Sequence, residues 1–276
     1  MQRTRPWELS EEVWERAERL LPAPKPHPKG GRPPRSDREM LGAILYVLRT
    51  GLQWNALPRE IGASTTAYDR FRAWERDGFF ARLWAAGLAE YDELVGIDWE
   101  WLSLDGVMTK APFGGAATGA NPTDRGKRGT KRSTLCEGHG LPLAIVVAGA
   151  NVPDMKLVAP TLDALIVSTP AGPAQLCLDK GYDYDLSRYA ATTRGYTLHL
   201  RTRGEERHAA AGDPLKRPRR WVVERLHSWL NRSRRLLVRW EKLERTYLAF
   251  VHLACALICF QQCDRSAHLQ HLLTPG

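Results

Sequence analysis

Cysteine is scarce in this 276-residue sequence and follows neither a metal-binding nor a secretory pattern. There are five cysteines, an odd number, and no CxxC pair or matching histidine pair accompanies them. Zinc sites and disulfide frameworks need such pairs, so we expect reduced, buried thiols. Three of them, Cys255, Cys259 and Cys263, share one face of an apolar helix. No signal peptide precedes the first helix, which favours the cytoplasm.

The sequence also lacks an apolar run of membrane-spanning length. Its most apolar stretch, 247–260, is shorter than the roughly 20 residues that a span needs, and His252 interrupts it. There is no internal repeat. With 43% hydrophobic residues the chain can bury the core of one large domain or of two. We therefore expect no membrane partner.

Positive charge is in excess and is unevenly distributed. The net charge is +9, and residues 201–276 hold 15 Lys and Arg against 7 Asp and Glu. A basic block of this kind favours a polyanionic partner, nucleic acid first. The alternative is a basic surface that only keeps the protein in solution.

Helical periodicity dominates the first hundred residues, with helices predicted over 11–21, 36–48, 64–77 and 79–93. A proline-rich linker, 22–34, separates the first two. A short helix over 57–62, a turn at Ala63 and the helix 64–77 resemble a helix-turn-helix. The last of these helices carries Arg70 and Arg72, which predicts contact with DNA. A purely structural helical lid is the alternative.

From Trp99 onward the pattern becomes that of strands, predicted over 101–104, 131–136, 141–148, 175–178 and 196–200. Helices are predicted over 154–167, 186–193, 221–240 and 246–262. The fold class is therefore α/β after a small all-helical domain. We place the boundary between 1–97 and 98–276.

Three acidic residues are candidates for a metal site that acts on phosphates. Asp105 and Asp179 each end a short apolar strand, and Glu224 lies on an arginine-rich helix. Magnesium prefers oxygen ligands and takes few of them from protein, so three carboxylates suit it. Strand ends hold carboxylates rigidly at the edge of a sheet.

Glu224 has a competing interpretation as a surface glutamate paired within its helix. At about 100° per residue, its side of the helix is polar and basic, while the opposite side is apolar. The residues on its side are Arg220, His227, Ser228, Asn231 and Arg235. Periodicity alone leaves both interpretations open.

Basic residues elsewhere are candidates for contact with a DNA backbone. They are Lys127, Arg128, Lys131 and Arg132 in and after a glycine-containing loop, and Arg225 and Arg232 near Glu224. A solvated loop is the alternative for the first group. Asp124 in this loop, Asp154, Asp183 and Asp185 are better explained as loop, turn or helix-cap residues than as ligands.

Several ordered motifs together resemble the DDE-type transposases of bacterial insertion sequences, in the group with a short catalytic core. They are 31–34 (GRPP), 45–58 (LYVLRTGLQWNALP), 103–106 (SLDG), 121–128 (NPTDRGKR), 140–143 (GLPL), 178–183 (LDKGYD), 221–225 (WVVER), 239–242 (RWEK) and 247–250 (YLAF). The resemblance covers nearly the whole chain. It favours Glu224 as the third acid over a surface glutamate.

The resemblance implies a ribonuclease-H-like sheet with Asp105, Asp179 and Glu224 as ligands of Mg²⁺, for which Mn²⁺ can substitute. One departure concerns the helix of the third acid. Relatives often have a tyrosine before its arginine and a lysine after the glutamate, where this chain has Arg217 and Asn231. The interval from Asp179 to Glu224 leaves no room for a large insertion domain.

The function implied is transposition: binding of double-stranded DNA at the terminal repeats of the element, strand cleavage, and transfer of the 3′-hydroxyl to target DNA. Pairing of two ends implies a homodimer or a higher oligomer, and DNA as partner implies association with the nucleoid. Two alternatives remain: a ribonuclease-H-like nuclease without strand transfer, and a transposase-derived DNA-binding protein that has lost catalysis.

Overall fold

The computed structural model describes residues 5, 7–23, 34–169, 174–201 and 221–273. The first part is helical: α1 (Glu11–Glu18), α2 (Asp37–Thr50), α3 (Ser64–Asp77) and α4 (Phe79–Leu94). Ser10 and Ser36 cap α1 and α2 by accepting hydrogen bonds from backbone N–H groups one turn later. Gly78 ends α3 in the left-handed conformation.

The prediction of a short helix over 57–62 is wrong, so α3 does not pair with a helix in that segment. Residues Trp54–Ala56 form a 3₁₀ turn (η1), and Pro58 then accepts the backbone N–H groups of Ile61 and Gly62 in a tight turn. Leu57 is extended, as residues before proline usually are, and this prevents a helix from starting there. The partner that packs beside α3 is therefore α2.

The second part is built on one sheet of six strands among the described residues: β1 (Trp101–Lys110), β2 (Gly119–Ala120), β3 (Arg128–Cys136), β4 (Pro142–Gly149), β5 (Ala174–Asp179) and β6 (Tyr196–Arg201). The long strands lie in the order β4–β3–β1–β5–β6. β3 is antiparallel to both β1 and β4, whereas β5 is parallel to β1 and β6 to β5. This is the ribonuclease-H-like arrangement that the resemblance implies.

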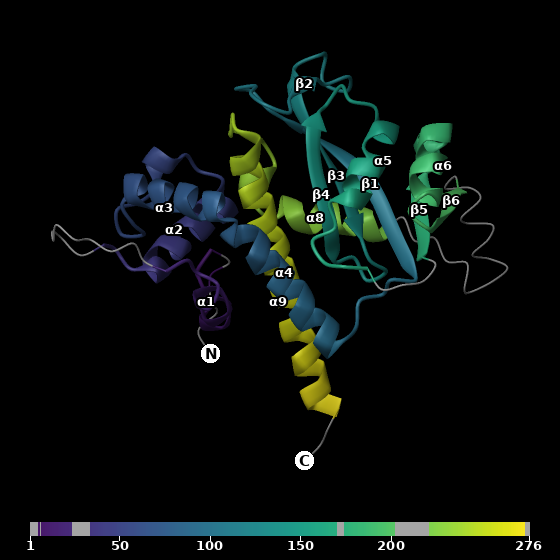
Figure 1. Ribbon diagram of the computed structural model, residues 1–276. Coiled ribbons are helices and arrows are strands. Elements are labelled where there is room, and N and C mark those ends of the chain that lie inside the picture. Colours follow the sequence, from purple (N-terminus) through teal and green to yellow (C-terminus); the bar gives the residue numbers. More distant parts are fainter. Residues whose placement is uncertain (1–4, 6, 24–33, 170–173, 202–220, 274–276) are drawn as a thin grey trace.

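Helices cover both faces of this sheet (Figure 1). Side chains of β3 identify the faces: Ser133 contacts Thr161 of α5 (Val158–Asp163), and its neighbour Arg132 contacts Asn231 of α8 (Trp221–Asn231). Because successive side chains of a strand alternate, α5 and α8 lie on opposite faces. α6 (Asp185–Thr192) packs beside α5, and α9 (Glu244–Leu273) packs beside α8.

Two predicted helices are shorter than expected. The helix predicted over 154–167 is a 3₁₀ turn, Asp154–Lys156 (η2), followed by α5, because Ile166 leaves the helix to donate its N–H to Leu143 of β4.

The helix predicted over 221–240 ends at Asn231. After it, Arg235 donates to the carbonyl of Leu52 and pairs with Glu241 at 2.6 Å. Arg239 donates to the carbonyl of Ala116 at 2.6 Å. These buried arginines tie the chain to distant segments, so it cannot continue as a regular helix.

The last helix connects the two parts of the protein. α9 packs along α4 and also contacts β4 and α8. By length and composition it is the one helix among the described residues that could cross a membrane, but 78% of its most apolar window is buried inside the protein. It is longer than the predicted 246–262 and acts as a central core helix. A domain boundary at 97/98 stays a prediction.

Candidate active site

Asp105 and Asp179 are brought to one face of the sheet by strand register. β1 and β5 pair in parallel up to Ser103 and Cys177, and each aspartate follows two residues later. Both side chains therefore point to the same face, at the level where β1 and β5 stop pairing. That face is the one covered by α8, because Asp105 lies directly opposite Thr134, on the same side of β3 as Arg132.

The expectation that β1 ends at Asp105 is wrong. Pairing between β1 and β3 continues through Gly106 and Ser133 to Lys110 and Gly129. Asp105 lies inside a ten-residue strand. The antiparallel partner β3, which follows β1 in the chain, extends the strand beyond its apolar residues, so Asp105 is held by backbone hydrogen bonds on both sides of its position.

Glu224 lies in the first turn of α8, which packs across β1 and β3. Val222, Val223 and Leu226 are buried against the sheet, whereas Glu224 is exposed. His227, one turn later, points to Asp105, with 3.9 Å between its Nε2 and Oδ2 of the carboxylate. The helix that carries Glu224 therefore also places His227 next to Asp105.

The donor chemistry of this region fits a divalent metal, because carboxylate oxygens are the ligands that Mg²⁺ and Mn²⁺ prefer. Two carboxylates share one face by register, and α8 lies over that face. Within the described ranges, no three His, Cys, Asp or Glu side chains converge closely enough to hold an ion. The ligand set Asp105, Asp179 and Glu224 therefore stays a prediction.

Polar side chains are buried beside Asp105, on the same face of the sheet. Arg132 and Thr134 are fully buried, and His227 is 7% exposed. Arg132 donates one hydrogen bond, from Nη2 to Oδ1 of Asn231 at 3.0 Å. Burial and the nearby charge of Arg132 lower the pKa of His227 to about 3, so its imidazole is neutral at ordinary pH.

On the opposite face of the sheet, a second cluster of polar side chains lies next to β1. Lys131 pairs with Asp154 at 2.8 Å, and a Cβ atom at Gly106 would lie 2.7 Å from that carboxylate. Tyr182 is buried there; burial first, then the charges of Asp105, Asp154 and Asp179, raise the pKa of its phenol well above the usual value. Asp154 was expected to cap a helix; instead it neutralises Lys131.

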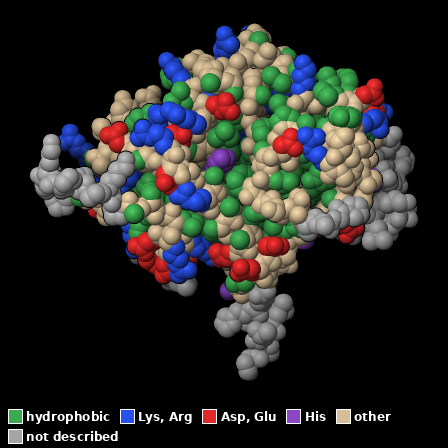
Figure 2. Space-filling view, in the orientation of Figure 1, with side chains coloured by type: hydrophobic (Ala, Val, Ile, Leu, Met, Phe, Trp, Pro, Cys, Tyr) green, Lys and Arg blue, Asp and Glu red, His purple; other side chains and the backbone are tan. Residues whose placement is uncertain are grey.

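The basic loop divides into exposed and buried residues. Lys127 and Arg128 are exposed. Lys131 is 5% exposed and paired, and Arg132 is fully buried, so the predicted contact of these two with a DNA backbone is wrong for this structure. Among the described residues on the face shown in Figure 2, Lys and Arg lie among Asp and Glu and form no continuous basic stripe.

The residues near Glu224 that were predicted to bind DNA also differ in their exposure to solvent. Arg232 is exposed, and Arg225 lies between the rings of Trp221 and Trp229, at 4.5 and 4.9 Å from their centroids. His227 and Arg235 are buried, which contradicts direct phosphate contact.

Asn231 accepts the hydrogen bond of Arg132, and Arg235 pairs with Glu241. Arg220, like Arg217 and residues 31–33 of the motif 31–34, lies outside the described residues.

The two arginines of α3 that were predicted to contact DNA have partners within the protein. Arg70 pairs with Asp37, and Arg72 lies 3.4 Å from a carboxylate oxygen of Glu75. Phe71 and Trp74 are buried, while Thr65 and Asp69 are exposed on the outer face. A role of α3 in reading DNA stays a prediction.

A sheet of this order, with acidic residues where its central strands separate, defines the ribonuclease-H-like class of α/β enzymes. Within it, residues 101–259 match the transposase DDE domain, and residues 9–84 match a transposase family of the IS4/5 group. The chain belongs to the DDE transposase family and is a transposase of an insertion sequence.

Relatives in sequence agree with this assignment. The transposase for insertion sequence element IS402 of Burkholderia cepacia is 36% identical over 166 residues, which are 58% of this chain and 76% of the relative. A 16.2 kDa protein of the same element is 36% identical over 118 residues, 41% of this chain and 80% of its own. A Mos1 transposase paired-end complex covers 85% of this chain and 82% of its own at 13% identity, with a TM-score of 0.28.

Proposed function

We propose that this transposase binds the ends of its element, cleaves DNA there and joins the 3′-hydroxyl to target DNA by metal-dependent phosphoryl transfer. The observation that carries the proposal is the placement of Asp105 and Asp179 at one level of one sheet face, with the helix of Glu224 across it. These three carboxylates would hold Mg²⁺, for which Mn²⁺ can substitute. The bound ions would stabilise the attacking and leaving oxygens.

The remaining residues would bind and orient DNA. Lys127, Arg128 and Arg232 are exposed cations on the elements next to the three acids and suit contact with phosphates. Residues 1–97 would supply recognition of the element ends, and residues 98–276 catalysis. Because one reaction must hold two ends together, the active complex would contain at least two copies of the chain.

The test is an assay of cleavage and joining on duplexes that carry the element ends. Asp105→Asn, Asp179→Asn and Glu224→Gln keep the shape of each side chain and remove its charge. Each is expected to lower cleavage at least about 1,000-fold, because the loss of a metal ligand removes stabilisation of the transition state, while DNA binding survives. Chelation of divalent metal should have the same effect on the parent protein.

Asp163→Asn is the matched control, since Asp163 is an exposed carboxylate on α5 that pairs with Arg194. It should cleave like the parent. Full cleavage by one of the three test variants removes that residue from the ligand set. Cleavage without joined product identifies a nuclease instead, and DNA binding without cleavage by the parent identifies a protein that has lost catalysis.

A further inference from the structure

We propose that a buried pocket beside Asp105, formed by Arg132, Thr134, His227 and Asn231, positions this carboxylate from the β3 side of the sheet face that carries it. The proposal rests on the proposed metal site and adds residues that hold one of its ligands in place. These four are positioning residues, because each would act through Asp105.

Strand register and helix packing place the pocket. Thr134 lies directly opposite Asp105 in the β1–β3 pair, and Arg132 follows two residues away on the same face. The side chain of His227 points from α8 toward this face, and its Nε2 lies 3.9 Å from Oδ2 of Asp105. Asn231, one turn further along α8, accepts a hydrogen bond from Arg132. Strand β3 and helix α8 thus each contribute two side chains to the pocket.

The pocket holds polar atoms that lack a partner despite their burial. They are Nε and Nη1 of Arg132, Oγ1 of Thr134, and both ring nitrogens of His227. A buried donor without a hydrogen bond has lost its bonds to water without replacement, and this destabilises the folded protein. Such groups are therefore rare unless the protein uses them, and here they lie on the face of the sheet that carries Asp105.

The chemistry of these groups matches a carboxylate. Arginine donates only, threonine has a hydroxyl donor, and neutral histidine has one N–H. The separation of 3.9 Å between His227 and Asp105 exceeds a hydrogen bond by about 1 Å, which a rotation of the aspartate side chain can close. One carboxylate oxygen would then be held by the pocket, and the other would remain directed outward.

A second imidazole, which is half-buried, makes the test specific. His252 of α9 packs against Trp84, with 5.3 Å between ring centroids, and burial lowers its pKa to about 4. Its ring lies against α4 rather than over Asp105. His227→Phe and His252→Phe therefore make the same substitution at a buried and at a half-buried imidazole. The proposal requires a metal-binding defect from the first variant alone.

The experiment measures Mn²⁺ binding to the full chain by electron paramagnetic resonance of the free ion, with thermal melting as a check on folding. His227→Phe should weaken Mn²⁺ binding about 10-fold, in the range typical for residues that orient a metal ligand. His227→Gln, which restores an N–H donor, should recover part of the loss. His252→Phe should bind like the parent.

Thr134→Val keeps the proposal testable if the histidine variants fold poorly, because it exchanges one hydroxyl for a methyl group. It should weaken Mn²⁺ binding several-fold. Parent-like binding by a folded His227→Phe or by Thr134→Val overturns the pocket. Asp105→Asn separates the two proposals: if the parent binds Mn²⁺ no better than this variant, the metal site itself fails.

Discussion

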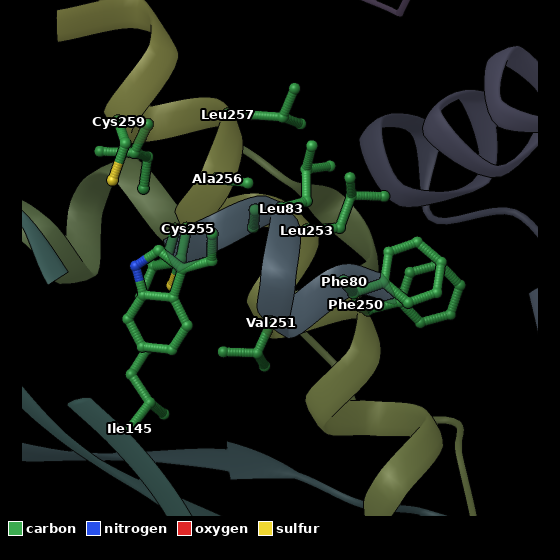
Figure 3. Close-up of a cluster of buried hydrophobic side chains, with 14 of the residues drawn as sticks. Phe80, Leu83, Ile145, Phe250, Val251, Leu253, Cys255, Ala256, Leu257 and Cys259 are labelled. Carbon is green, nitrogen blue, oxygen red and sulfur yellow. The ribbon is translucent and has the colours of Figure 1, made fainter. Parts of the chain in front are cut away.

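Two buried regions on either side of α9 are built from opposite chemistry. Between α4 and α9 the side chains are apolar: Phe80 of α4 and Phe250 of α9 both pack against Phe71. Figure 3 shows Ile145 on the sheet side of this buried cluster. Between α8 and strand β3 the buried side chains are polar and include Arg132 and Thr134. Several of their polar atoms have no hydrogen-bond partner. The apolar region stabilises the fold, and the polar region holds hydrogen-bond donors that suit a metal-binding carboxylate.

Close approach characterises the apolar region. A Cβ atom at Gly87 of α4 would lie 2.9 Å from Cβ of Cys259, so only glycine lets the two helices come this near. The aromatic rings of Phe71 and Phe250 stack at 4.4 Å between centroids. A region this tightly packed gains most of its stability from burial of apolar surface. Its variants should therefore alter stability and leave metal binding unchanged.

The largest stability effect is expected from Phe250→Ala. Phe250 is fully buried, and its removal leaves a cavity that should lower the free energy of unfolding by about 3–5 kcal/mol. Urea denaturation measures this loss. Leu269→Ala on the same helix is the control, since Leu269 is 58% exposed and should change stability little. Weakened Mn²⁺ binding by a folded Phe250→Ala would break the separation between the two regions.

A pH effect comes next in size. The folded pKa of His252 is about 4, below its usual 6.5. The unfolded chain therefore takes up a proton near pH 6.5 and the folded one does not, so His252 destabilises the protein as pH falls from 6.5 to 4. His252→Phe should reduce the loss of unfolding free energy between pH 7 and 4.5 by about 2–3 kcal/mol.

Denaturation of parent and variant at both pH values measures this difference. His227 contributes in the same direction, because its pKa is also depressed, so part of the pH dependence should persist in the variant. An identical loss in parent and variant would show that the ring of His252 reaches water in the folded protein.

The outer face of α3 offers a smaller and more specific effect. Thr65 and Asp69 are exposed, while the inner face of the same helix belongs to the apolar region. If α3 reads the major groove, replacement of the outer residues should lower discrimination between element ends and scrambled DNA by about 1–3 kcal/mol per lost base contact. Stability should be unchanged.

Competition binding of Thr65→Ala, Asp69→Ala, Arg70→Ala and Arg72→Ala tests this prediction. The two arginines must first release Asp37 and Glu75, so their variants also need a stability measurement. Equal loss on both duplexes would show contact with the backbone only. No loss on either would make α3 a structural element.

The smallest effect concerns exposed charge. Lys127→Ala and Arg128→Ala should each lower the slope of log affinity against log salt by about one, since each lost phosphate contact releases one counterion fewer. Lys156→Ala is the control, because Lys156 is exposed on the opposite face of the sheet. An unchanged slope in the two test variants would make these residues solvated surface.

Local signals in the sequence predicted most of the elements. Helical periodicity marked the helices and apolar runs marked the strands, because these signals act within a few residues. The acids at 105, 179 and 224 and the order of motifs predicted the class of enzyme. The three buried cysteines of α9 also followed from periodicity.

Errors arose where a distant partner decides the outcome. The end of α8 depends on Arg235 and Arg239, whose partners include Leu52 and Ala116. The length of β1 depends on β3. A periodicity window covers neither partner, so the predicted helix was too long and the strand too short.

The sequence by itself determined the apolar faces, the caps and the identity of the acids. Only the tertiary structure decided which basic residues reach solvent. Arg128 and Arg132 differ by four positions in one strand, yet the first is exposed and the second is enclosed by α8 and the sheet. Burial of a charge depends on what packs over it, and the helix that covers Arg132 begins almost ninety residues later in the chain.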